Sequence, residues 1–288
     1  GKHSIYDFLY REENKYTTAP NNRLTRKAVD FWEIFNISGL STGLINIPMT
    51  YPPAQVNGYM ITGIMTPRAE PIEKVDYSYP KSLKYEIKDK VGKYIIHPKV
   101  QYRKGRVKEV YDDLLDDLYI KSKTIQYLME KYPTDLTMFV IGGTDKILHD
   151  LYHLLDSNHF RYDVEEAKRD KHFVLDYYKK VDQELGAIIN KFCNDDTLIV
   201  IMSDHGNGPI YKWIYLNNWL LKEGYLTLKK TPLTLIKRIL FSVGITPGNI
   251  YKILLKFGFS KSKTSFELRD ELISRFFLSW EDIDWKHT

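Results

Sequence analysis

The sequence contains a single cysteine, Cys193, so no disulfide can form within the chain. This scarcity of cysteine favours a reducing compartment, and we expect a cytoplasmic protein. The sequence also has no apolar run near the roughly 18 residues that a membrane-spanning helix requires. Hydrophobic residues nevertheless make up 43% of the 288 residues, which is enough to bury one large core. The composition therefore excludes a small disulfide-stabilised scaffold and indicates a globular protein.

Residues 229–263 have no Asp or Glu, although the net charge of the whole chain is only +5. Two amphipathic helices are expected in this segment, one after Thr231 and one after Thr246, because the Pro that follows each Thr suits the first helical position. The preferred interpretation is a small helical insertion packed on the core. Contact of residues 229–263 with an anionic substrate or an acidic membrane surface is the alternative. The basic side chains are Lys229, Lys230, Lys237, Arg238, Lys252, Lys256, Lys261 and Lys263.

No nucleic-acid-binding motif accompanies these basic side chains, so we expect no sequence-specific binding of nucleic acid. The sequence says nothing about the oligomeric state.

Residues 198–202 are a continuous aliphatic run, which is typical of a parallel strand covered on both faces. The run is followed by Asp204 and His205. Because chemistry in open parallel sheets lies just beyond the carboxyl ends of the strands, we expect these two side chains at a functional site. A glycine-rich polar turn without function is the alternative.

A second short apolar stretch, residues 136–141, leads through two glycines to Asp145 and His149. The spacing of four residues places the carboxylate and the imidazole side by side on the first turn of a helix. Asp145 could instead be an ordinary helix N-cap. Mixed carboxylate and imidazole ligands suit zinc, with manganese or another transition metal as an alternative, and two such pairs suggest two metal ions. His153, one turn further, is expected to be structural or to support the ligands.

Three segments, GTDKILHDLYHLLD, SDHGNGP and YLNNWLLKEGYL, resemble the type I phosphodiesterase/nucleotide pyrophosphatase group of the alkaline phosphatase superfamily. GKHSIYDF at the start and INIPMTYPP at residues 45–53 are also similar, and the likeness extends to residue 230. The resemblance implies that Asp145 and His149 serve one metal ion, and Asp204 and His205 the other. It also implies a Thr or Ser that attacks phosphorus, after which an activated water releases the product.

Some residues that the resemblance implies have no counterpart in this chain. The nucleophile and a further Asp ligand would precede residue 1, so we expect the chain to be an interior part of a larger domain that does not turn over by itself. A third ligand, a His in a Gly-x-His setting, is not matched by His287, which is left unassigned. Thr144 is the hydroxyl nearest to Asp145, but we expect it to cap or orient the turn. The catalytic residues are therefore unknown.

The sequence predicts strands at residues 44–47, 59–62, 136–141 and 198–202, and long helices at residues 107–128 and 174–192. Residues 67–106 show no clear period and are expected to form an irregular excursion over the surface. Two acidic pairs of the first long helix, Asp112-Asp113 and Asp116-Asp117, are expected to face water.

This alternation predicts an α/β fold of the alkaline phosphatase type, a mostly parallel sheet with helices on both faces. Residues 1–228 would form the core, incomplete at its start, and residues 229–288 a basic helical insertion or cap. We expect a metal-dependent hydrolase of phosphate esters, either a phosphodiesterase or a nucleotide pyrophosphatase. The alternatives are a phosphomonoesterase, phosphotransferase or phosphomutase, or a metal-stabilised binding protein without turnover. The lack of a Cys/Ser-x-Pro-x-Arg motif disfavours a sulfatase.

Overall fold

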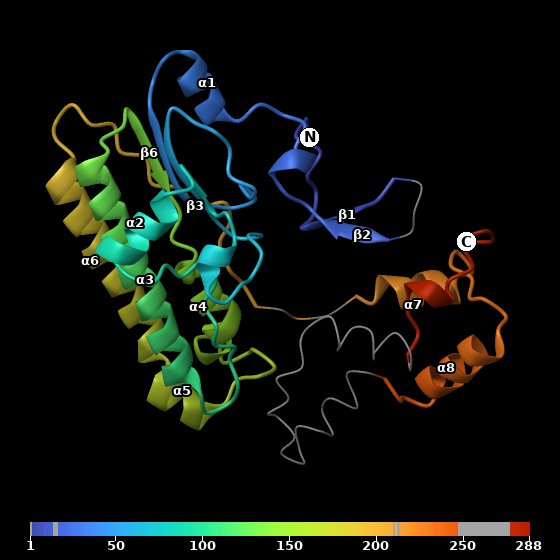
Figure 1. Ribbon diagram of the computed structural model, residues 1–288. Helices are drawn as coiled ribbons and strands as arrows, with labels where there is room; N and C mark the ends of the chain where they lie inside the picture. The colour runs from blue at the N-terminus through green and yellow to red at the C-terminus, as the bar shows by residue number, and fades with distance from the viewer. Residues whose placement is uncertain (1, 14–16, 210, 212–213, 247–276) are drawn as a thin grey trace. The chain divides into compact units, whose positions relative to one another are not determined.

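The computed structural model describes residues 2–13, 17–209, 211, 214–246 and 277–288. The chain divides into two compact units, Gly1–Arg11 with Thr18–Tyr211 and Glu12–Thr17 with Lys212–Thr288. The first unit begins with an antiparallel hairpin of β1 (Leu9–Arg11) and β2 (Thr18–Pro20) and then forms a sheet with helices (Figure 1). Its helices are α1 (Phe31–Ile37), α2 (Leu83–Lys90), α3 (Val107–Lys131), α4 (Gly143–Leu151), α5 (Val164–Asp170) and α6 (His172–Phe192), with 3-10 turns η1 (Arg23–Thr25), η2 (Ile72–Lys74) and η3 (Tyr152–Leu154).

The sheet of the first unit has four described strands in the order β5-β4-β3-β6. β3 pairs in parallel with both β4 and β6, and β5 is antiparallel to β4. All six residues of β3 are buried, as expected for a central strand covered on both faces. The strands predicted at residues 44–47, 59–62 and 136–141 are therefore confirmed. Their observed bounds are Thr42–Ile47 for β3, Gly58–Thr62 for β4, Ser78–Tyr79 for β5 and Leu136–Phe139 for β6.

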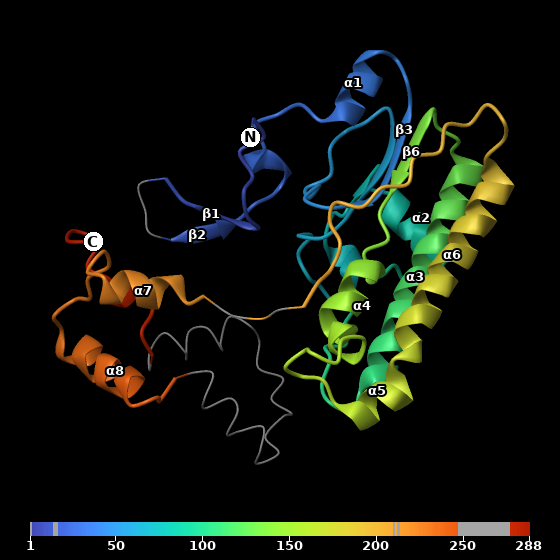
Figure 2. The ribbon, with the colours of Figure 1, turned by 180° about the vertical axis from the view of Figure 1, so that it is seen from behind.

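The two faces of the sheet enter different hydrophobic clusters, because successive side chains of a strand point to opposite faces. On one face, Ile45 and Ile61 pack with buried side chains of α2, α3 and α6. On the other face, Leu44 and Met60 pack with Trp32 of α1. The long helices α3 and α6 lie side by side in both views, and their contact extends the core beyond the sheet (Figures 1 and 2).

The helices predicted at residues 107–128 and 174–192 are confirmed as α3 and α6, but one expectation about α3 is wrong. Asp117 does not face water. It is fully buried, and Lys121 Nζ lies 2.7 Å from its Oδ1. Asp117 follows Leu114 by three residues and therefore shares its buried stripe. Burial raises the pKa of Asp117, while the charge of Lys121 opposes this shift.

Residues 67–106 are more regular than expected, because they contain η2, β5 and α2. Leu83 and Ile87 of α2 are buried one turn apart and pack against the sheet. A helix of two turns has too few residues for its apolar period to be evident in the sequence.

Residues 198–202 form no strand, so this prediction is wrong for the described chain. Their side chains are 45–88% exposed. An apolar run becomes a strand only where a neighbouring strand takes its backbone hydrogen bonds, and among the described strands β6 pairs with β3 alone. The first unit is thus an α/β structure with a mixed sheet that is parallel at its centre, and its alkaline phosphatase-type architecture stays a prediction.

The second unit contains α7 (Leu216–Lys222), α8 (Pro232–Ser242) and the 3-10 turn η4 (Trp280–Asp282). α8 begins as predicted, since Thr231 Oγ1 accepts a hydrogen bond of 3.2 Å from the amide of Thr234. Contrary to expectation, α8 buries Thr234 and Lys237 and exposes most of its apolar stripe. Asp282 is the cause, because it accepts hydrogen bonds from Thr234 Oγ1 at 2.8 Å and from Lys237 Nζ at 3.0 Å.

The helix expected after Thr246 lies outside the described residues, together with half of the basic side chains of residues 229–263. The assignment of residues 229–288 as an insertion, and any contact with an anionic surface, therefore stay predictions. Of the helices that the described residues form, none is long and apolar enough to cross a membrane.

Candidate metal centre

The connection from β6 to α4 is fixed by its neighbours on both sides. Asn46, in β3, donates a hydrogen bond of 2.7 Å from Nδ2 to the carbonyl of Val140, and the amide of Val140 donates to the carbonyl of Ile45. Asn46 has a left-handed backbone with φ of 61°, which Asn tolerates better than most residues. At the start of α4, a Cβ added to Gly143 would overlap the hydroxyl of the buried Tyr177 of α6. These contacts set the position of the first turn of α4.

Asp145 and His149 lie on that turn and the next. His149 Nε2 is 3.2 Å from Asp145 Oδ1, as their spacing of four residues predicted. The imidazole of His149 is 62% exposed, whereas Asp145 Oδ1 is buried and accepts no hydrogen bond. A carboxylate at this place is favoured by the positive end of the helix dipole.

Asp204 and His205 follow the extended residues 198–202. His205 Nε2 lies 3.9 Å from Asp145 Oδ1 and 3.6 Å from Asp204 Oδ2. His205 Nδ1 lies 3.0 Å from the carbonyl of Gly206, which can only accept, so Nδ1 carries the proton of this contact. The Gly206 carbonyl, followed by the Asp204 and Asp145 carboxylates, raises the pKa of His205.

The two predicted pairs therefore meet, although 59 positions separate Asp145 from Asp204. The four side chains form a row of contacts and not a closed shell, and the described residues contain no group of three or more His, Cys, Asp or Glu arranged to hold a metal ion. Their donor chemistry nevertheless fits a divalent cation, because a buried carboxylate oxygen without a hydrogen bond faces two imidazole nitrogens.

A family model described as type I phosphodiesterase / nucleotide pyrophosphatase matches residues 1–269, which include both pairs. The chain belongs to this family. Membership in the type I phosphodiesterase/nucleotide pyrophosphatase family places it in the alkaline phosphatase superfamily and implies hydrolysis of phosphate esters. The match extends beyond residue 230, where the motif resemblance ended. No curated protein and no solved structure matches the chain.

Phosphodiesterases that form a covalent intermediate need a hydroxyl beside the metal ions. Thr144 Oγ1 donates to the carbonyl of Ile141 at 3.3 Å, and Ser203 Oγ donates to the carbonyl of His205 at 2.6 Å. Both hydroxyls next to the candidate ligands are thus engaged by local backbone. The expectation that Thr144 orients the turn is confirmed.

His153 supports the α4 region and does not join the row of candidate ligands. It is 3% exposed, and its Nε2 lies 2.9 Å from the hydroxyl of Tyr102, which also lies 3.1 Å from both carboxylate oxygens of Glu166. Burial is the main cause that lowers the pKa of His153. The structural role predicted for His153 is confirmed.

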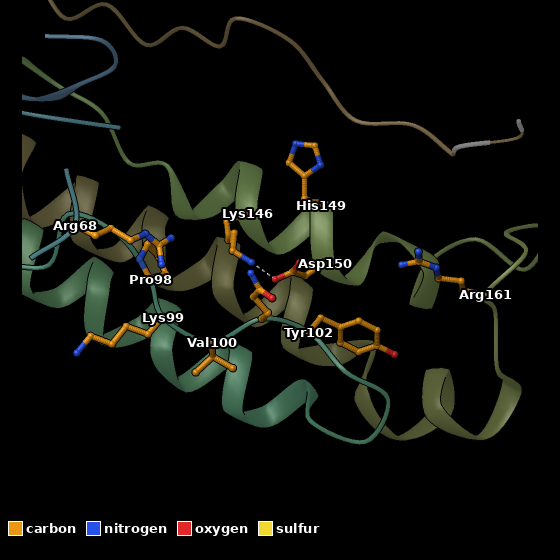
Figure 3. A pocket seen from close by; sticks show the side chains of 10 residues that line it. Arg68, Pro98, Lys99, Val100, Tyr102, Lys146, His149, Asp150 and Arg161 are labelled. Carbon is orange, nitrogen blue, oxygen red and sulfur yellow. Dashed lines mark hydrogen bonds and ion pairs between the residues drawn. The ribbon is translucent and has the colours of Figure 1, made fainter. Parts of the chain in front are cut away.

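A cavity of about 290 Å³ opens beside His149, on the side of α4 away from its imidazole (Figure 3). It could not be predicted from the sequence, because three of its cationic side chains, Arg68, Lys99 and Arg161, come from loops without a periodic pattern. The cavity is lined by Arg68, Pro98, Lys99, Val100, Gln101, Tyr102, Lys146, His149, Asp150 and Arg161.

Proposed function

We propose that this member of the type I phosphodiesterase/nucleotide pyrophosphatase family hydrolyses phosphodiesters with two divalent metal ions, zinc or manganese. Asp145 and His149 would hold one ion, and Asp204 and His205 the other. The convergence of both pairs on Asp145 Oδ1 carries the proposal, because that oxygen is buried without a hydrogen bond and two imidazole nitrogens face it at 3.2 and 3.9 Å.

Bound ions of this kind neutralise phosphoryl oxygens and activate a hydroxyl or a water for attack on phosphorus. The protein contributes the positions of the ligands. Asp145 is held on the first turn of α4, where the helix dipole stabilises its charge. His205 keeps Nε2 toward Asp145, because the Gly206 carbonyl engages its Nδ1. The nucleophile would be a Thr or Ser other than Thr144 and Ser203, whose hydroxyls already donate to backbone carbonyls.

Metal binding by the full chain tests the ligand set without requiring turnover. Titration calorimetry with zinc or manganese should find two sites. Asp145→Asn and His205→Asn should each weaken metal binding by more than about tenfold, since even residues that only orient ligands contribute 10- to 100-fold. Asp182→Asn and His172→Asn are the controls, because they remove one carboxylate and one imidazole from exposed positions of α6. They should leave the metal affinities of both sites unchanged. A chain that binds no metal would refute the proposal.

Hydrolysis of bis-p-nitrophenyl phosphate with either metal gives a second readout. Any rate above background should disappear in Asp145→Asn and persist in Thr144→Ala. Loss of the rate in Thr144→Ala, with unchanged metal affinity, would instead identify Thr144 as the nucleophile. Two bound ions without hydrolysis of any diester would support the metal ligands and agree with the expectation that these 288 residues do not turn over by themselves.

A further inference from the structure

The cavity beside His149 lies where several segments of the first unit converge. Arg68 belongs to the segment that follows β4, residues 98–102 precede α3, and Arg161 precedes α5. The segments after β4 and after β6 both leave the carboxyl ends of parallel strands, which is the usual side for ligands in such sheets. Figure 3 shows Arg68 at one end of the cavity, Arg161 at the other, and Lys146 with Asp150 between them.

The charges that line this cavity are mainly positive. Lys146 forms an ion pair with Asp150, and Lys99 Nζ lies 3.7 Å from an exposed Glu70 carboxylate. Arg68 and Arg161 have no ion pair with any residue that the structure describes. The guanidinium of Arg161 lies over the Phe160 ring at 5.1 Å, which supports its flat face and leaves its N–H groups available for a ligand.

Two nearby histidines, the half-buried His97 and the buried His153, have pKa values that these positive charges help to lower. Burial lowers the pKa of His97, and the charge of Arg68 lowers it further. Burial also lowers the pKa of His153. The charge of Glu166 raises this pKa, and the charge of Arg161 lowers it. The positive charges of Arg68 and Arg161 are therefore felt by side chains beside the cavity.

The cavity wall is fixed by hydrogen bonds to nearby helices and loops. The amides of Lys99 and Val100 donate to Asp113 Oδ2 at 2.7 and 2.8 Å. His97 Nε2 donates to the carbonyl of Thr66 at 2.8 Å, which ties this wall to the segment that carries Arg68. Asp113 is half-exposed, and its carboxylate also holds the cavity wall in place.

We propose that this cavity binds a phosphate-bearing part of the substrate other than the phosphodiester that is cleaved, with Arg68 and Arg161 as the anion-binding side chains. The inference rests on the proposed function, because it treats the cavity as an extension of the site at Asp145 and His149. A volume of about 290 Å³ is near the lower limit of small-molecule pockets, which suits a phosphate or pyrophosphate group with part of its carrier. Arginine is preferred for phosphate because its fork donates two parallel hydrogen bonds.

Pyrophosphate binding by the full chain tests the cavity independently of metal and turnover. The protein is freed of metal on a chelating resin and titrated with inorganic pyrophosphate in a calorimeter. Saturable binding is expected, and it should weaken in 0.5 M salt because screening shortens the reach of exposed charges. Arg68→Gln and Arg161→Gln should each weaken it about tenfold, the effect expected for one charge-assisted hydrogen bond.

Two matched variants locate the bound anion. Arg106→Gln removes a guanidinium that is already paired with Glu109 and lines no part of the cavity, so it should leave the pyrophosphate affinity unchanged. Asp204→Asn removes a candidate metal ligand but no lining residue and should also leave it unchanged. Equal affinities of wild type, Arg68→Gln and Arg161→Gln, or no saturable binding, would overturn this inference, whereas absent metal binding would overturn only the proposed function.

The same phosphate chemistry occurs in soluble esters and in lipid headgroups. Sedimentation with phosphatidylcholine vesicles, with and without phosphatidate, separates the two sources. Retention on phosphatidate vesicles that Arg161→Gln abolishes would assign the group to a lipid, and pyrophosphate binding without vesicle retention would assign it to a soluble ester. Retention that is equal for wild type and both arginine variants would count against the cavity as the site.

Discussion

Gly143 has no room for a side chain, because the Tyr177 hydroxyl lies where its Cβ would be. We predict that Gly143→Ala lowers the free energy of unfolding by about 1–3 kcal/mol, the usual cost of overpacking a filled core. The added methyl should also push the first turn of α4 outward, displace Asp145 and weaken metal binding. Thermal unfolding and zinc titration of the variant measure the two effects.

Gly186 provides the control for this substitution. It lies inside α6, and nothing lies within 4 Å of the place where its Cβ would be. Gly186→Ala should therefore stabilise the chain by about 0.5–1 kcal/mol, because Ala has the higher helix propensity. Tyr177→Phe combined with Gly143→Ala should recover part of the loss. Equal unfolding free energies of Gly143→Ala and wild type would show that α4 is not fixed by this contact.

At the scale of elements, α8 is held to the C-terminal segment by a buried pair. Lys237 and Asp282 are 4% and 6% exposed in their side chains, and Lys237 Nζ is 3.0 Å from Asp282 Oδ2. Removal of one partner of a buried pair leaves the other charge uncompensated and costs about 3–5 kcal/mol. We predict that Lys237→Met releases α8, seen as a loss of hydrogen-exchange protection, while the exposed Lys230→Met has no effect.

The same pair predicts the response of this contact to pH. Burial opposes the ionisation of Asp282, but hydrogen bonds from Lys237, Thr234 and the Ser279 amide outweigh it and hold the pKa below the ordinary 3.8. Because the folded pKa is lower than the unfolded one, the stabilisation is complete above the unfolded value and is lost as pH falls through the folded value. Protection of α8 in wild type should thus stay constant from pH 7 to about 5 and fall below about pH 3.8. A loss of protection near pH 6 would contradict this assignment.

Elements of several turns were predictable from the sequence, and short or unpaired ones were not. α3 and α6 repeat their apolar period many times, and β3 is aliphatic because both faces are buried. α2 is too short to show a period, and residues 198–202 have the composition of a strand without a described partner. The composition of a segment determines its preference for strand or helix, but a strand forms only where a neighbouring strand is available to pair with it.

Some residues of the candidate site and the cavity could likewise be predicted from the sequence, and others could not. Spacing predicted that Asp145 and His149 would meet, and the ends of two apolar stretches predicted that His205 would join them. Asp117 could have been assigned to the buried stripe, since it follows Leu114 by three residues. Arg68 and Arg161 could not have been found, because loops bring them to one cavity and no period connects them.

At the scale of the whole molecule, residues 198–202 present an exposed aliphatic surface, and β6 is the last described strand at its edge of the sheet. Apolar surface and open strand edges promote association between chains. We predict that the chain self-associates as its concentration rises, as measured by light scattering coupled to size-exclusion chromatography. Val200→Lys and Met202→Lys should shift it toward the monomer.

Ala187→Lys is the control, because it adds the same charge at an exposed position of α6. It should leave the association unchanged. If Val200→Lys unfolded the chain instead, residues 198–202 would be buried in solution, as the sequence alone indicated.

Helix α4 carries both sites at once, and this has a consequence for substrate length. Asp145 and His149 face the candidate metal centre, while Lys146 and Asp150, one residue further in each case, line the cavity. Neighbouring residues of an α-helix differ by about 100° in direction and about 1.5 Å in height. With the two proposed sites on these two faces, we predict that the distance and the bend between two phosphates decide which molecules bind, whatever organic group joins them.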